Sequence, residues 1–174
     1  VLEYLKERKD GYDVLVANTI YADAFGSRLV QNIREEKGYT YSPSGDFTTR
    51  RAGSLLQVQA DVRNEVTAAA LLEVFYELDR MAATTPTPDE LAGAKRYQAG
   101  LYLLRNQIQD AIARFEQAMA IDGALGNAWL GRGLCRIQKG QIQAGREDLQ
   151  VAALLEPQRA LPRSYLGKAY DRAH

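Results

Sequence analysis

The sequence is poor in the side chains that most metal and nucleophilic sites need. Among 174 residues it has one cysteine, Cys135, and one histidine, the terminal His174. A single cysteine excludes an internal disulfide and a cysteine-based zinc cluster, and apolar neighbours favour a buried structural role for it. A Ser-His or Cys-His pair would have to use a terminal residue. We therefore expect no catalytic residue, no metal site and no cofactor.

The sequence also lacks an excess of charge of one sign and a long apolar segment. It carries 22 Lys+Arg and 22 Asp+Glu, so electrostatics offer no attraction to nucleic acid or to an anionic membrane. The longest apolar run, at 68–72, is far shorter than the ~20 residues that span a bilayer. We expect a soluble protein with neither kind of partner, periplasmic or cytoplasmic if it is bacterial.

The first part of the chain, up to about residue 109, has the pattern of mixed helix and strand. Helices are predicted over 12–20 and from a Gly26-Ser27 cap to Gly38. Alternation from Leu56 to Val62 predicts a half-buried strand, paired in an antiparallel hairpin with an aromatic and β-branched segment at 39–49. Arg51-Ala52-Gly53 is the expected turn.

Two further helices follow the expected hairpin. Residues 66–81 form an amphipathic helix, and its apolar face carries Leu71, Leu72, Phe75 and Leu78. The next helix is expected to begin with a capping box, in which Thr87 is the N-cap, Pro88 the first helical residue and Glu90 the third.

From about residue 88 onward the sequence predicts only helices, and it repeats with a period of 34. Asn106–Gln109 aligns with Gly140–Gln143, and Ala118 aligns with Ala152. The aromatic Trp129, the small Gly133 and the closing Pro157 match the pattern of tetratricopeptide repeats. Residues 94–174 therefore resemble that family, which implies stacked helical hairpins whose small residues allow close approach.

The first part resembles a different family. The segments 16–20, 25–29 and 33–42, followed by Glu90, Ala94 and Lys95, are similar to the non-catalytic half of insulinase-type (pitrilysin-like) zinc metallopeptidases. The resemblance implies an α+β unit with helices packed on an antiparallel sheet. In that family a separate catalytic half carries His-x-x-Glu-His, which this chain lacks.

The same resemblance implies that Arg34 and Tyr41 contact substrate. A cation and a phenol both donate hydrogen bonds to a peptide carbonyl. The residues alone leave an alternative open, because an arginine near a helix C-terminus favours the helix dipole and a tyrosine in a strand is ordinary.

A second candidate site lies in the repeat. Arg132, Arg136 and Lys139 recur at helical spacing and are expected to line a peptide-binding face that holds a carboxylate. The alternative is a solvated basic stripe.

The two resemblances overlap in one helix. We expect an α+β fragment over 1–93 and a tetratricopeptide-like array over 94–174, with a helix at 95–109 shared by both. No flexible linker separates them, which indicates a chimera, engineered or natural. The expected function is that of a non-enzymatic scaffold or of a module that binds a protein or peptide, and a chimera without a selected activity is a further reading. The alternative is a substrate-contacting subunit that needs a zinc-bearing catalytic partner. An exposed sheet edge would favour a homodimer.

Overall fold

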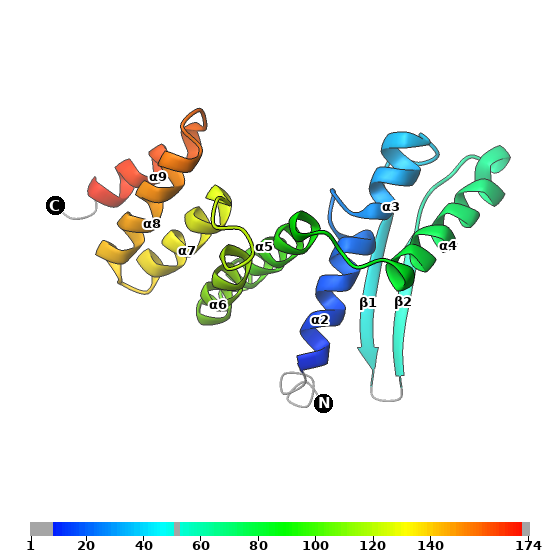
Figure 1. The fold of residues 1–174 in the computed structure, drawn as a ribbon, viewed down its shortest axis with the longest axis horizontal. Coiled ribbons are helices and arrows are strands. Elements are labelled where there is room, and N and C mark those ends of the chain that lie inside the picture. Colours follow the sequence, from blue (N-terminus) through cyan, green and yellow to red (C-terminus); the bar gives the residue numbers. More distant parts are fainter. Residues whose placement is uncertain (1–8, 51–52, 172–174) are drawn as a thin grey trace. The chain divides into compact units, whose positions relative to one another are not determined.

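The chain divides into two compact units between Glu90 and Leu91. The computed structural model describes residues 9–50 and 53–171. The first unit combines helices with a two-stranded sheet, and the described part of the second unit is helical (Figure 1). The expected α+β class is correct in outline, although helix predominates over strand. No helix among the described residues is long and apolar enough to cross a membrane.

The described part of the first unit starts with two helical stretches that widen into π-helical turns. α2 (Lys9–Asn18) continues as η1 (Thr19–Asp23), and α3 (Arg28–Val30) continues as η2 (Gln31–Glu36). The Ser27 side chain caps α3 by accepting a hydrogen bond from the Val30 amide at 3.5 Å. Gly38 follows η2 in the left-handed region, with φ of 62°. The cap and the stop that the sequence predicts for this helix are confirmed.

The expected antiparallel hairpin is present. β1 (Ser44–Arg50) pairs with β2 (Gly53–Gln59), so that Phe47 lies opposite Leu56. The first strand begins later than the aromatic run at 39–42, and the expected turn falls partly on residues 51–52, outside the described residues. Within the described ranges the sheet contains two strands, so each strand has one edge without a strand neighbour.

The core of the first unit lies between one face of the hairpin and the helices. Leu56 and Val58 are half-buried while Leu55 and Gln57 are exposed, which confirms the predicted alternation of β2. The core joins residues of η1, α3, η2, β2 and α4 (Thr67–Ala83), a helix preceded by the short turn η3 (Asn64–Val66). Its members are Tyr21, Ala22, Leu29 and Ile33, packed with Leu56, Val58, Ala60, Val74 and Met81.

The apolar face expected for α4 is not the face that packs on this core. Ala70, Val74, Glu77 and Met81 face inward instead. The side chains of Leu71, Leu72 and Phe75 are exposed by 55%, 71% and 56%, and Leu78 is exposed as well. The helix is apolar on two sides, and the sequence pattern does not show which side meets the sheet.

The second unit is a series of consecutive helices. They are α5 (Pro88–Leu104), α6 (Ile108–Met119), α7 (Gly126–Gln138), α8 (Ile142–Leu155) and α9 (Ala160–Asp171), with α5 beginning just before the division of the chain. α6 and α8 begin 34 residues apart, as do α7 and α9. Buried residues of α5, α6 and α7 form one cluster, and those of α7, α8 and α9 form another. The 34-residue period of the sequence is therefore a period of helices.

Both ends of α5 follow from local chemistry. The Thr87 amide donates to Glu90 Oε2 at 2.8 Å and the Glu90 amide donates to Thr87 Oγ1 at 3.2 Å, which confirms the capping box. The expected extension of this helix to residue 109 is not observed. Asn106 adopts a left-handed conformation with φ of 59°, which ends the helix before α6 begins at Ile108.

Glycines bring the helices of the second unit close together. A Cβ atom at Gly131 would lie 2.2 Å from Cζ of Phe115, and one at Gly133 would lie 2.9 Å from the carbonyl oxygen of Gly145. Neither distance leaves room for a methyl group. α7 therefore packs on α6 and on α8 at a separation that only small residues permit.

Candidate functional site

The structure brings the first predicted pair together on the surface of the first unit. The guanidinium carbon of Arg34 lies 4.9 Å from the centre of the Tyr41 ring and 4.6 Å from the centre of the Phe25 ring. Both rings are largely exposed, by 81% for Tyr41 and 66% for Phe25. The three side chains form an accessible cation–aromatic cluster, which we call the Arg34 cluster.

The backbone holds this cluster in place through η2. Arg34 lies in its last turn, directly after the fully buried Ile33. The Tyr39 amide donates to the Ile33 carbonyl at 2.8 Å, and the Gly38 amide donates to the Arg34 carbonyl at 3.1 Å. These bonds reverse the chain after η2, and Tyr41 comes two residues later. Arg34 Nε also lies 3.2 Å from Glu35 Oε1, where the Arg34 side chain is partly buried and that of Glu35 is exposed.

Sequence reasoning missed Phe25 as part of this cluster. The aromatic residue directly precedes the Gly26-Ser27 cap, and only the fold places it beside a residue of η2. In chemical terms the cluster offers guanidinium donors, a phenol hydroxyl and two flat apolar surfaces. Such a surface suits an extended peptide, whose carbonyl groups accept hydrogen bonds and whose side chains pack on rings.

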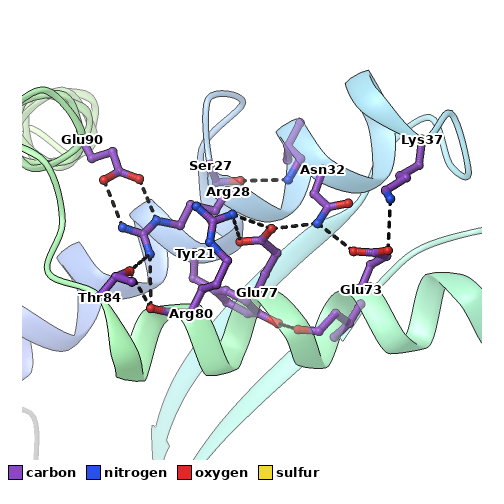
Figure 2. Close-up of polar contacts among 12 residues, drawn as sticks. Tyr21, Ser27, Arg28, Asn32, Lys37, Glu73, Glu77, Arg80, Thr84 and Glu90 are labelled. Carbon is purple, nitrogen blue, oxygen red and sulfur yellow. Dashed lines mark hydrogen bonds and ion pairs between the residues drawn. The ribbon is translucent and has the colours of Figure 1, made fainter.

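A polar groove of about 700 Å³ lies beside η2, between α3, η2 and α4. At one end, Arg28 donates from Nε and Nη2 to the two carboxylate oxygens of Glu90 at 2.7 and 3.1 Å, and from Nη1 to Thr84 Oγ1 at 2.9 Å (Figure 2). The Arg28 hydrogen bond is the largest influence that lowers the pKa of Glu90 to about 2, with the Thr87 amide contributing further.

At the other end of the groove, Asn32 bridges two carboxylates of α4. Its Nδ2 donates to Glu77 Oε1 at 2.7 Å and to Glu73 Oε2 at 3.0 Å (Figure 2). Lys37 Nζ lies 3.3 Å from Glu73, and Arg80 Nη1 donates to both oxygens of Glu77. Hydrogen bonding from Asn32 and then from Lys37 lowers the pKa of Glu73, against a smaller rise from burial.

The hydrogen bonds of Asn32 and the Lys37–Glu73 ion pair hold η2 against α4. Glu77 is only 1% exposed, and its charge is compensated by Arg80. Because each of these carboxylates already has a cationic or amide partner, the network fixes the helix that carries Arg34 and does not itself offer free ligands. Nothing in the linear sequence distinguishes Glu77 from the other acidic residues of α4.

In the second unit, Arg132 and Arg136 lie together around one buried carboxylate. Asp148 is 2% exposed, and its oxygens lie 2.7 Å from Arg132 Nη2 and 2.9 Å from Arg136 Nη1. Glu116 of α6 lies 3.4 Å from Arg132 and 3.7 Å from Arg136. Lys139 does not join this cluster, and its Nζ donates to Gln109 Oε1 instead.

The charges of Arg132 and Arg136 are thus compensated by Asp148 and Glu116. The guanidiniums connect α7 with α8 and α6, and they are mostly buried. A separate groove of about 350 Å³ lies between α7 and α9. It is lined by Leu134, Ile137, Gln138, Tyr165, Lys168 and Ala169. Sequence reasoning missed it, although these α7 residues recur at helical spacing.

The described residues contain no group of three or more His, Cys, Asp or Glu side chains that could hold a metal ion. Cys135 is fully buried, as its sequence context indicates, and burial raises the pKa of its thiol to about 11. A thiol of that kind is protonated at neutral pH and is a poor nucleophile.

Comparison with known proteins gives a matching family model and several similar solved structures, of which two follow. Residues 4–97, more than half of the chain, match the model of the peptidase M16 inactive domain. A peptidase M16 inactive domain from Pseudomonas fluorescens has 22% identity and a TM-score of 0.51 over 87% of this chain. This chain covers 35% of that structure. The TPR domain of Arabidopsis OM64 has 20% identity and a TM-score of 0.44, covering 61% of this chain and 86% of that one. No curated protein matches.

Proposed function

Because the chain belongs to the peptidase M16 inactive-domain family, we propose that it is a non-catalytic module that binds proteins or peptides. The match confirms the resemblance found in the first part of the sequence. The observation that carries the proposal is the Arg34 cluster, where a guanidinium and two exposed aromatic rings form one surface. Clusters of this composition are typical of protein-binding sites, which are enriched in tyrosine and arginine.

An extended peptide is the ligand that fits this cluster best. A cation–aromatic contact uses the face of a guanidinium and leaves its N–H edge, so Arg34 keeps donors besides Nε, which lies 3.2 Å from Glu35. Those donors are available to main-chain carbonyls, and the Tyr41 hydroxyl adds another. Phe25 and Tyr41 then cover apolar side chains of the ligand.

A more specific form of the proposal is a substrate-contacting subunit of a zinc peptidase. In this form Arg34 and Tyr41 hold a peptide, and a partner protein with His-x-x-Glu-His supplies the zinc and the activated water. Among the described residues, no group of three or more His, Cys, Asp or Glu side chains could hold a metal ion. The catalytic step belongs wholly to the partner in this proposal.

The groove between α7 and α9 is the second candidate surface. Three partly buried apolar residues and the cation Lys168 line it, which suits an apolar side chain next to an acidic one. Arg132 and Arg136 would then stabilise the helices behind the ligand rather than hold its carboxylate. The unpaired edges of β1 and β2 are a further possible contact between copies of the chain.

Binding of a fluorescein-labelled, unfolded casein to the full chain tests the proposal. Arg34→Ala removes the central donor, and we expect about tenfold weaker binding, since a charge-assisted hydrogen bond contributes roughly 1.5 kcal/mol or more. Tyr41→Phe keeps the ring and should weaken binding about two- to threefold. Arg63→Ala, an exposed arginine of the same unit, is the matched control.

The outcomes separate the candidate surfaces and functions. Weakening by Lys168→Glu with no effect of Arg34→Ala assigns binding to the α7–α9 groove. Cleavage of casein by the chain alone contradicts the non-catalytic proposal. The chain is also mixed with a zinc-bearing partner that carries His-x-x-Glu-His. If the rate of casein cleavage in this mixture is the same with Arg34→Ala and Tyr41→Phe as with the unchanged chain, the proposal of a substrate-contacting subunit is contradicted.

A further inference from the structure

One face of α4 carries a regular apolar pattern that no described part of the first unit covers. Ala68, Leu71, Phe75, Leu78 and Ala82 are all exposed. Their spacings alternate between three and four residues, which is the a/d spacing of a coiled coil. We call this row the α4 seam. It runs from Ala68 to Ala82, along almost the whole of α4 (Thr67–Ala83).

The core of the first unit does not need the α4 seam. Val74 and Met81 pack against the core cluster from the inward side of the helix, and Ala70 and Glu77 are buried there. The α4 seam is therefore a second apolar side of a helix that is already anchored. Exposed apolar patches of this extent ordinarily mark interaction surfaces, and the 3.5-residue period indicates that the partner element is a helix.

Charge decides which helix fits. Glu73, Glu77 and Arg80 are the other charged residues of α4, and all three are paired within the groove beside η2. Asp79 is exposed, directly follows Leu78 and flanks the α4 seam, and no ion pair among the described residues involves it. A partner helix on the α4 seam would cover Asp79 and must supply a cation to compensate it.

We propose that the α4 seam docks an amphipathic helix of another protein that carries Lys or Arg beside its own apolar seam. This surface is separate from the Arg34 cluster, and the inference does not depend on peptide binding there. A second copy of α4 fits less well, because its seam is flanked by Asp79 and offers no free cation. An anionic lipid surface is repelled by the same carboxylate.

Two synthetic helical peptides of about three heptads test the inference. They share a Leu/Ala seam and differ in the flanking positions, which carry Lys in one peptide and Glu in the other. Binding to the full chain is measured by fluorescence anisotropy. We expect the Lys peptide to bind about three- to fivefold more tightly than the Glu peptide, in line with a partly exposed ion pair.

Variants of exposed residues complete the test without disturbing the core. Phe75→Glu should weaken binding of the Lys peptide by about tenfold or more, because it places a charge at the centre of the α4 seam. Asp79→Lys should reverse the preference between the two peptides. Leu55→Glu, an exposed apolar residue of the same unit, should bind like the unchanged chain. Circular dichroism checks that each variant keeps its helix content.

Several results would overturn the inference. Equal binding of the two peptides, or binding of neither, contradicts a basic partner helix. Self-association of the chain that Phe75→Glu abolishes assigns the α4 seam to a second copy. Binding to phosphatidylglycerol vesicles that Phe75→Glu abolishes assigns it to a membrane. None of these results depends on whether Arg34→Ala affects casein binding.

Discussion

Arg28 and Glu90 form a bidentate ion pair, in which Nε and Nη2 of Arg28 donate to separate oxygens of the Glu90 carboxylate. The same carboxylate accepts the Thr87 amide at 2.8 Å, so one side chain serves both the helix cap and the groove network. The first turn of α5 is thereby fixed to the start of α3. Local capping chemistry and a contact across 62 residues of sequence depend on one ionised group.

We expect this pair to make the protein sensitive to acid. The pKa of Glu90 is lowered to about 2 from an ordinary value of 4.5, so its stabilising effect is complete above about pH 4.5 and disappears as the pH falls toward 2. Glu90→Gln should cost about 1–2 kcal/mol at neutral pH, a moderate figure because part of the side chain is exposed, and should lose less stability on acidification than the unchanged chain. Urea unfolding at a series of pH values measures both effects.

Asp89→Asn is the matched control for that prediction. Asp89 lies in the same turn of α5 and is exposed, so its replacement changes the helix-dipole interaction without breaking the Arg28 pair. If Asp89→Asn and Glu90→Gln alter the acid profile equally, the ion pair is not the cause.

A second pH effect is expected at the alkaline end. Burial, and then the charge of Glu77, raises the pKa of Tyr21 to about 12 from its ordinary value of 10. Because the folded state holds this proton more tightly, its stabilisation is present below about pH 10 and is lost as the pH rises from about 10 to 12. Ultraviolet titration should show one tyrosine that ionises late in the unchanged chain and is absent in Tyr21→Phe.

Close helix packing predicts opposite effects for two glycine substitutions. Gly133→Ala places a methyl group 2.9 Å from the Gly145 carbonyl and should destabilise the protein by about 1–3 kcal/mol. Gly100→Ala meets no atom within 4 Å and should stabilise α5 by up to about 1 kcal/mol, the usual difference between Gly and Ala in a helix. Thermal unfolding of both variants measures the difference, and equal effects contradict the packing argument.

Asp148, Arg132 and Arg136 form a mostly buried charge cluster. We expect that removing the Asp148 charge alone destabilises the protein more than removing all three charges. Asp148→Ala leaves Arg132 and Arg136 together without their shared partner and should cost about 3 kcal/mol or more. The triple variant Arg132→Leu/Arg136→Tyr/Asp148→Leu replaces all three charges with uncharged side chains of comparable size. Its free energy of unfolding should lie within about 1 kcal/mol of the unchanged chain or above it. A triple variant as unstable as Asp148→Ala contradicts this.

Local signals in the sequence predicted local structure well. The caps at Ser27 and Thr87, the stop at Gly38 and the alternation of β2 each depend on a few adjacent residues, and each is confirmed. The end of α5 could also have been predicted from the sequence. Asn106 lies 34 residues before Gly140, and both residues have a positive φ. The repeat therefore already indicates that α5 ends near Asn106, whereas the predicted shared helix continued to residue 109.

Contacts between segments far apart in the sequence could not be predicted from such local signals. The pair Arg34 and Tyr41 came from a family resemblance, but Phe25 joins them only because the fold places the residue before the Gly26-Ser27 cap beside η2. The basic residues of α7 were predicted to line a peptide-binding face, with a solvated stripe as the alternative. Their ion pairs with Asp148 were not foreseen, because Asp148 is twelve residues beyond Arg136 and its burial depends on how α8 packs.

By itself the sequence determined the family and the helical repeat, because these depend on residue identity and spacing alone. Only the tertiary structure decided which charges are neutralised and which apolar face stays exposed. α4 shows the reason, since the helix has two apolar sides and a helix packs with whichever side matches its neighbours in shape and charge. That choice buried Val74 and Met81 against the core and left Leu71, Phe75 and Leu78 available to a partner.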